Sequence, residues 1–132
     1  MSSSEAISIL ESLTHDLQSL KKLADGDPQN TLDHCRKTID KLDIAIINLL
    51  NERVAVANVI ADVKKDLDIP VYVPTREADV IRNILAANEG PLSDEAARRL
   101  YERIIDETRS NERQRYQGHH FDESSEVDDT SD

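Results

Sequence analysis

The chain has 132 residues, about the size of one domain, and carries 27 Asp and Glu against 16 Lys and Arg. Six of the acids follow Gly118, where no Lys or Arg occurs, so residues 1–117 keep a net charge of −5, from 16 basic and 21 acidic side chains. A body that repels phosphate is not expected to bind nucleic acid or an anionic membrane, although locally gathered cations can hold a small anion.

The cysteine and histidine content and the lack of a targeting signal narrow the class of protein further. Cys35 is the only cysteine, so no intrachain disulfide forms and a cysteine-based metal site is not expected. No apolar run approaches the ~20 residues that span a bilayer, and "MSSSEAISILESL" lacks the basic region and cleavage site of a signal peptide. We expect a cytoplasmic protein with no metal and no cofactor. The four histidines have no matching partners and are interpreted as surface residues: His15, His34, His119 and His120.

Few glycines, prolines and aromatic residues, with abundant Leu, Ile, Ala, Glu and Arg, predict an all-α fold. The first helix is predicted from about Ser4 to Ala24, with a capping box from Ser2 and Glu5. Its apolar stripe consists of Leu10, Leu13, Leu17 and Leu20. "DGDPQN" ends this helix, because Gly26 and Pro28 are breakers.

The second predicted helix is the longest, from Thr31 to about Leu67, with no Gly or Pro inside it. A heptad-like apolar seam follows it, made of Leu32, Cys35, Ile39, Leu42, Ile46, Leu49, Val56, Ile60, Val63 and Leu67, with Arg53 as the one charged member. At 1.5 Å per residue the rod would be about 54 Å long. A compact domain of this size has a radius of gyration of only ~14 Å, so other helices or a second chain must cover the seam. We therefore predict an intertwined homodimer.

Two shorter helices complete the predicted fold. One starts near Pro74, a favoured first helical residue, and ends near Asn88, with an apolar face of Ala78, Ile81, Ile84 and Leu85. The last is capped by Ser93 and runs to about Tyr116 along a stripe of Ala97, Leu100, Tyr101, Ile104 and Ile105. The predicted domains are an N-terminal helical extension and linker (1–30), a helical domain (31–116) and a disordered acidic tail (117–132).

Charged residues inside the apolar seam mark a candidate site. A buried Arg53 would cost several kcal/mol without an anion beside it, and the alternative is that its head reaches solvent. Lys64 follows eleven residues later, about 20° round the helix from Arg53, so the two cations share one face. Arg36 points about 100° away from Arg53 and would serve a different cavity, that of the partner subunit. Taken singly, Lys64 and Arg36 are typical of solvated surface charges.

Two further pairs break local rules. Arg76 is a cation in the first turn of its helix, where the helix dipole disfavours positive charge, and Glu77 follows it directly. The pair is either part of a binding site or an exposed ion pair of little energetic value. Thr108 and Glu112 continue the apolar stripe of the last helix at four-residue spacing, which predicts that they face the interior unless the helix has run past the core. Together these residues would form a cradle for a compact dianion, with a polar group to recognise a hydroxyl.

These motifs resemble the all-helical class of chorismate mutase. The resemblance runs from Leu32 to about Gln114 and follows, in order, "RKTIDKLD", "LLNERVAVANVIADVKK", "PVYVPTREADVI" and "GPLSDEAARRLYERIIDETRS". One departure is Val73, which stands where the family often has an acid.

The resemblance implies a role for each candidate residue. Arg36 would be donated across the dimer, and Arg53 would bind a substrate carboxylate. Lys64 would contact a carboxylate and the ether oxygen that breaks. Glu77, beside Arg76, would accept from the ring hydroxyl of the substrate. The remaining two implied contacts are those of Thr108 with a carboxylate and of Glu112 with the ether oxygen.

The implied activity is the rearrangement of chorismate to prephenate in aromatic amino-acid biosynthesis. This unimolecular reaction needs no cofactor; holding a reactive conformer and directing positive charge at the ether oxygen suffice. Lys64, Arg53 and Glu112 are the predicted catalytic residues, and we hypothesise that Glu112 donates as the protonated acid. Two alternatives remain open: an isochorismate-pyruvate lyase, and a regulatory or binding module whose partner is a shikimate-pathway enzyme.

Overall fold

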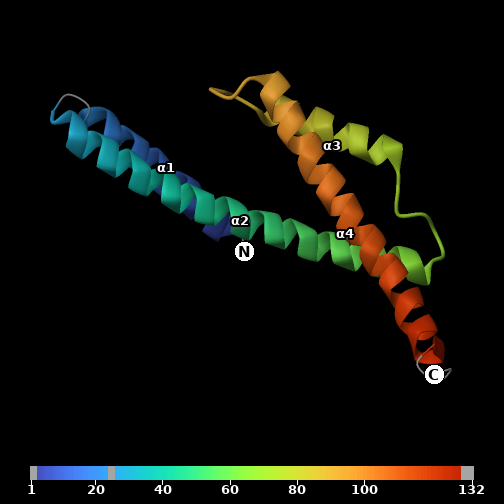
Figure 1. Cartoon of the computed structure of the whole chain (residues 1–132). Helices are drawn as coiled ribbons and strands as arrows, with labels where there is room; N and C mark the ends of the chain where they lie inside the picture. Colours follow the sequence, from blue (N-terminus) through green and yellow to red (C-terminus); the bar gives the residue numbers. More distant parts are fainter. Residues whose placement is uncertain (1–2, 24–25, 129–132) are drawn as a thin grey trace. The chain divides into compact units, whose positions relative to one another are not determined.

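The structure is a computed structural model that describes residues 3–23 and 26–128. These residues form four helices in chain order (Figure 1): α1 (Ser3–Leu23), α2 (Pro28–Asp66), α3 (Pro74–Ala87) and α4 (Asp94–Asp128). No strand occurs among the described residues, which confirms the predicted all-α class. Ser2, of the predicted capping box, lies outside them.

The chain divides into two compact units, residues 1–53 and residues 54–132, and the boundary between them falls inside α2. The predicted domain boundaries at residues 30 and 116 stay predictions. α4 continues past Tyr116, its predicted end, to Asp128. The predicted disorder of residues 117–132 also stays a prediction.

In the first unit, α2 begins earlier than predicted because Asp27 caps it. The Asp27 carboxylate accepts a hydrogen bond from the backbone N–H of Gln29 at 3.1 Å, and its carbonyl accepts from the N–H of Thr31 at 3.0 Å. Pro28 therefore occupies the first helical position, where its missing N–H costs nothing. The predicted start of this helix at Thr31 was therefore three residues too late.

α2 ends in a Schellman motif at the residues just before the predicted break at Pro70. The N–H of Asp68 bonds to the carbonyl of Lys65, and the N–H of Ile69 bonds to the carbonyl of Lys64. Asp68 has φ +56°, the left-handed conformation that closes this motif. Aspartate is one of the few residues other than glycine that reach this conformation at low cost.

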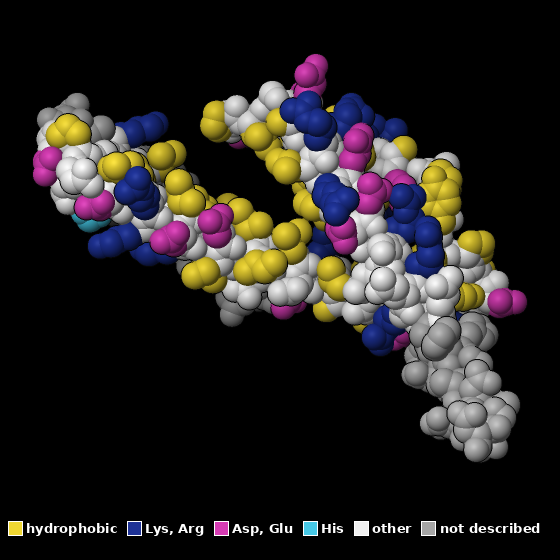
Figure 2. Space-filling view, viewed as in Figure 1, with side chains coloured by type: hydrophobic (Ala, Val, Ile, Leu, Met, Phe, Trp, Pro, Cys, Tyr) yellow, Lys and Arg dark blue, Asp and Glu magenta, His cyan; other side chains and the backbone are white. Residues whose placement is uncertain are grey.

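The apolar seam of α2 is largely exposed in the single chain. Eight of its ten apolar members are exposed: Leu32, Ile39, Ile46, Leu49, Val56, Ile60, Val63 and Leu67. Figure 2 shows hydrophobic side chains, in yellow, along this helix. In contrast, Ala57 and Ala61 are buried. The single chain thus leaves uncovered the surface that other helices or a second chain were expected to cover.

Composition alone would also allow α2 to cross a membrane. It contains a stretch of 18 residues that is apolar enough, with at most two charged side chains, and only 11% of that stretch is buried. The expectation that no apolar run approaches the length of a membrane span did not take this stretch into account. Length and composition are weak evidence, since core helices of soluble proteins meet the same criteria.

In the second unit, α3 packs against α4. α3 begins at Pro74 as predicted, and the carbonyl of Val73 accepts hydrogen bonds from the N–H groups of Arg76 and Glu77. The predicted cap of α4 is confirmed, because the Ser93 hydroxyl accepts from the N–H of Ala96 at 3.2 Å. The side-chain amide of Asn88 donates hydrogen bonds to the Leu92 carbonyl and to the Asp94 carboxylate. These two bonds link the end of α3 to the start of α4.

The buried residues of this unit come from α2 and α4: Ala57, Ala61, Ala97, Ile105 and Thr108. No residue of α3 is buried; Ile81, Ile84 and Leu85 are half-buried and Ala78 is exposed, so its predicted apolar face is only partly covered. Arg115 on α4 donates two hydrogen bonds of 2.9 Å to the Asp62 carboxylate on α2. Hydrogen bonding to Asp62 raises the pKa of the Arg115 guanidinium, and the negative charge of Asp62 raises it further.

Small side chains at the buried positions of α2 set how closely this unit packs. Ala61 is 1% exposed, so Ala61→Leu is expected to lower the free energy of unfolding by about 1–3 kcal/mol through overpacking. Urea unfolding followed by circular dichroism measures this. Ala55→Leu, at an exposed position of the same helix, is the matched control. Equal stability of the two variants would contradict the described packing.

Candidate active site

The structure places the seven predicted site residues in both units. Arg36 and Arg53 belong to the first unit; Arg36 is exposed and Arg53 is half-buried on α2. The other five belong to the second unit: Lys64 on α2, Arg76 and Glu77 on α3, and Thr108 and Glu112 on α4. The second unit therefore holds a cation, a hydroxyl and two acids of the predicted cradle on three helices, together with the exposed Arg76.

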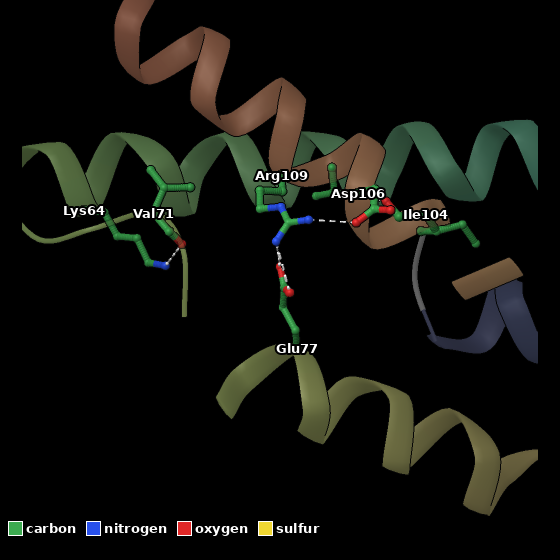
Figure 3. A network of polar contacts seen from close by, with 7 residues as sticks. Lys64, Val71, Glu77, Ile104, Asp106 and Arg109 are labelled. Carbon is green, nitrogen blue, oxygen red and sulfur yellow. Dashed lines mark hydrogen bonds and ion pairs between the residues drawn. The ribbon is translucent and has the colours of Figure 1, made fainter. Parts of the chain in front are cut away.

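Lys64 is half-buried and its ammonium is held in place. Nζ donates a hydrogen bond of 2.8 Å to the carbonyl of Val71, in the segment 67–73 that connects α2 to α3 (Figure 3). An ammonium has three donors, and this bond uses one of them. The segment thus fixes where the positive charge lies and leaves the ammonium able to donate to a ligand.

Glu77 is contacted by a cation that was not predicted from the sequence, Arg109 of α4. One terminal nitrogen of Arg109 lies 3.3 Å from one carboxylate oxygen of Glu77 and 3.4 Å from the other (Figure 3). Each of the two side chains is 28% exposed. The contact joins the first turn of α3 to the middle of α4, so it also ties the two packed helices together.

Arg109 has two more partners. Its other terminal nitrogen donates to Asp106, one turn earlier on α4, at 2.8 Å. Its guanidinium carbon lies 4.9 Å from the centre of the Tyr72 ring, within the range of a cation–π contact. Tyr72 follows Val71 directly, so adjacent residues of segment 67–73 contact Arg109 and Lys64.

Thr108 faces the interior, as its place on the α4 stripe predicted, and is 7% exposed. Its hydroxyl donates to the carbonyl of Ile104 at 2.7 Å. A hydroxyl has a single proton, so contact with a carboxylate through that proton would require the hydroxyl to turn away from Ile104. Glu112, one turn further on, is half-buried.

The second unit has a hollow whose lining differs from the predicted cradle. It has a volume of about 480 Å³ between α3 and α4 and shares only Glu77 with the seven residues. A second hollow, of about 370 Å³ and mostly apolar, is lined by Ile84, Leu92, Leu100 and Tyr101 among others. Among the described side chains, no group of three or more His, Cys, Asp or Glu residues is arranged to hold a metal.

Val71, Tyr72 and Arg109 are the contributors that were not predicted from the sequence. Arg109 had one local signal, its spacing of three from Asp106, which favours an ion pair on a helix. Its contact with Glu77 spans 32 residues and follows from no local pattern. Val71 acts through its backbone carbonyl, which no side-chain pattern reveals.

Comparison with known proteins gives consistent results. Residues 35–113 match the family chorismate mutase type II. The chain is 37% identical over 78 residues to the bifunctional chorismate mutase/prephenate dehydratase of Aquifex aeolicus, covering 56% of this chain and 22% of that protein. It is 41% identical over 78 residues to the protein of the same name from Neisseria gonorrhoeae, covering 59% of this chain and 21% of that protein. The chain thus spans about a fifth of the length of these relatives.

A solved structure, the chorismate mutase (Form II) of Thermus thermophilus, is 30% identical to this chain, with a TM-score of 0.61. The match covers 62% of this chain and 93% of that one. The family match spans more than half of the 132 residues and includes all seven predicted site residues. The chain therefore belongs to the chorismate mutase type II family.

Proposed function

We propose that this chain rearranges chorismate to prephenate in aromatic amino-acid biosynthesis, as a chorismate mutase of the cytoplasm. The observation that carries this proposal is the family match over residues 35–113, which includes every residue of the predicted cradle. The reaction breaks one C–O bond and forms one C–C bond within a single molecule. The protein has therefore only to hold a reactive conformer and stabilise the developing charge.

Lys64 is the main catalytic residue in this proposal. Negative charge grows on the ether oxygen of chorismate as the C–O bond breaks, and an ammonium fixed beside it stabilises the transition state more than the ground state. The bond from Nζ to Val71 supports this role because it restricts the ammonium before substrate binds. Arg53 on the same helix would bind a substrate carboxylate.

Glu77 would recognise the ring hydroxyl of chorismate. It is a carboxylate in the first turn of α3, where the helix dipole favours negative charge, and a carboxylate oxygen has lone pairs for more than one donor. Arg109 can therefore contact Glu77 while Glu77 accepts from a hydroxyl.

We also propose that two copies of the chain form the active species. The apolar seam of α2, exposed over eight of its ten apolar members, is the surface that a second copy would bury. Arg36 is exposed on the same helix and would enter the site of the other subunit. Arg53 would remain in the site of its own chain.

The first experiment measures the loss of the ultraviolet absorbance of chorismate. Wild type is expected to consume chorismate, and Lys64→Ala is expected to lower kcat by about 10²–10³ because one charged donor to the ether oxygen is lost. Lys65→Ala, its half-buried neighbour on α2, is the matched control and should keep nearly full activity. A wild type that instead converts isochorismate to salicylate and pyruvate would favour the lyase.

The second experiment tests the donation of Arg36 across the dimer. Arg36→Ala and Arg53→Ala are each expected to be nearly inactive. Mixed, unfolded and refolded together in equal amounts, they should recover about a quarter of wild-type activity, because half of the dimers then contain one intact site out of two. No recovery, in a mixture that sizes as a dimer, would place both arginines in the site of one chain.

The third experiment concerns Glu112. Only the protonated acid can donate to the ether oxygen, so wild-type kcat is expected to decline as pH rises and this acid ionises. Glu112→Gln cannot ionise and should give a flatter profile. A wild-type rate that stays level from acid to alkaline pH would show that Glu112 does not act as a proton-bearing donor.

A further inference from the structure

We propose that Arg109 is a positioning residue of the active site, which fixes the Glu77 carboxylate in the orientation that accepts the substrate hydroxyl. The inference rests on the proposed function and deepens it, since it assigns a second residue to the recognition of that hydroxyl. All the contacts that support it lie inside the second unit, between α3, α4 and the segment 67–73.

Without Arg109, Glu77 would be a flexible side chain at the start of a helix. A glutamate loses rotamer freedom when it is fixed, and a substrate that had to order it would bind more weakly for that reason. Arg109 orders it beforehand, because one nitrogen lies within 3.4 Å of both carboxylate oxygens. The guanidinium can do so only if it is itself held.

Two contacts hold the guanidinium. Its short bond, 2.8 Å, goes to Asp106 on its own helix, and the Tyr72 ring covers its face at 4.9 Å. A planar, forked cation suits both contacts, whereas a lysine ammonium would have neither the second nitrogen nor the flat face. The contacts to Glu77, at 3.3 and 3.4 Å, are longer than the bond to Asp106 and leave the carboxylate free to accept a stronger bond from a substrate.

Segment 67–73 connects this positioning to Lys64. Val71 accepts from the Lys64 ammonium, and the next residue, Tyr72, stacks on Arg109. The segment therefore sets the positions of the catalytic cation and, through Arg109, of the acid that would recognise the hydroxyl.

A double-mutant cycle on the full-length chain, with chorismate as substrate, tests the inference. Arg109→Ala is expected to lower kcat/KM by about tenfold or more, the range for a lost hydrogen bond to a charged group. If Arg109 acts through Glu77, the double variant Arg109→Ala/Glu77→Gln should be no worse than Glu77→Gln alone. A merely structural arginine would instead multiply the two losses.

Two further variants and a check of folding show whether the charge or the shape of the Arg109 side chain matters for activity. Arg103→Ala removes the exposed partner of Glu107 on the same helix, a 2.7 Å pair, and should leave activity near wild type. Arg109→Lys keeps the charge and should recover only part of the loss. Circular dichroism checks that each variant is folded. If Arg109→Ala is not folded, Tyr72→Leu and Tyr72→Phe are compared in its place. Activity is then expected to fall in Tyr72→Leu but not in Tyr72→Phe.

The possible results are distinct. Losses that multiply in the cycle, or an Arg109→Ala variant as active as Arg103→Ala, would overturn this inference while chorismate turnover by wild type upholds the proposed function. A wild type that does not consume chorismate would overturn both.

Discussion

The apolar surface of α2 is the constraint on which the rest of the structure depends. A helix of 39 residues is about 58 Å long at 1.5 Å per residue, and its apolar seam remains exposed at most positions in the single chain. Large exposed apolar surfaces are rare on monomeric soluble proteins and often mark an interaction surface. The proposed second copy would bury this one and would also bring two sets of α2 cations into one assembly. The same surface explains why composition alone cannot tell this helix from a membrane-spanning one.

The second unit shows how a chain with few aromatic residues can still order charged side chains. Its buried positions are mostly alanines, so α2 and α4 keep small side chains where they are most covered. Specific polar contacts add to this packing: Arg115 joins α4 to α2 through Asp62, and Arg109 joins α4 to α3 through Glu77. Ion pairs that solvent still reaches contribute only modest free energy. Their importance lies in orientation, since each fixes one helix relative to another near a predicted site residue.

The sequence predicted those features that rest on local chemistry. The start of α3 at Pro74, the Ser93 cap of α4 and the inward-facing Thr108 all follow from residue preferences or from helical periodicity. The start of α2 was missed because Pro28 suits both a break and a first helical position, and only the bonds of Asp27 decide between them. Arg109 was missed because its partner Glu77 lies 32 residues away. The assignment of the seven site residues to one reaction came from the resemblance of the sequence to a family and not from a local pattern, and it stays a prediction.

The adjacency of Val71 and Tyr72 bears on how this family member can evolve. Connecting segments ordinarily tolerate insertions and deletions, and segment 67–73 is mostly exposed. Here, however, a backbone carbonyl and the next aromatic ring reach two different charged side chains, so one added or deleted residue would misplace both at once. Selection would then preserve the length of this connection, and an aromatic residue at its sixth position, while leaving the identity of Val71 free to drift.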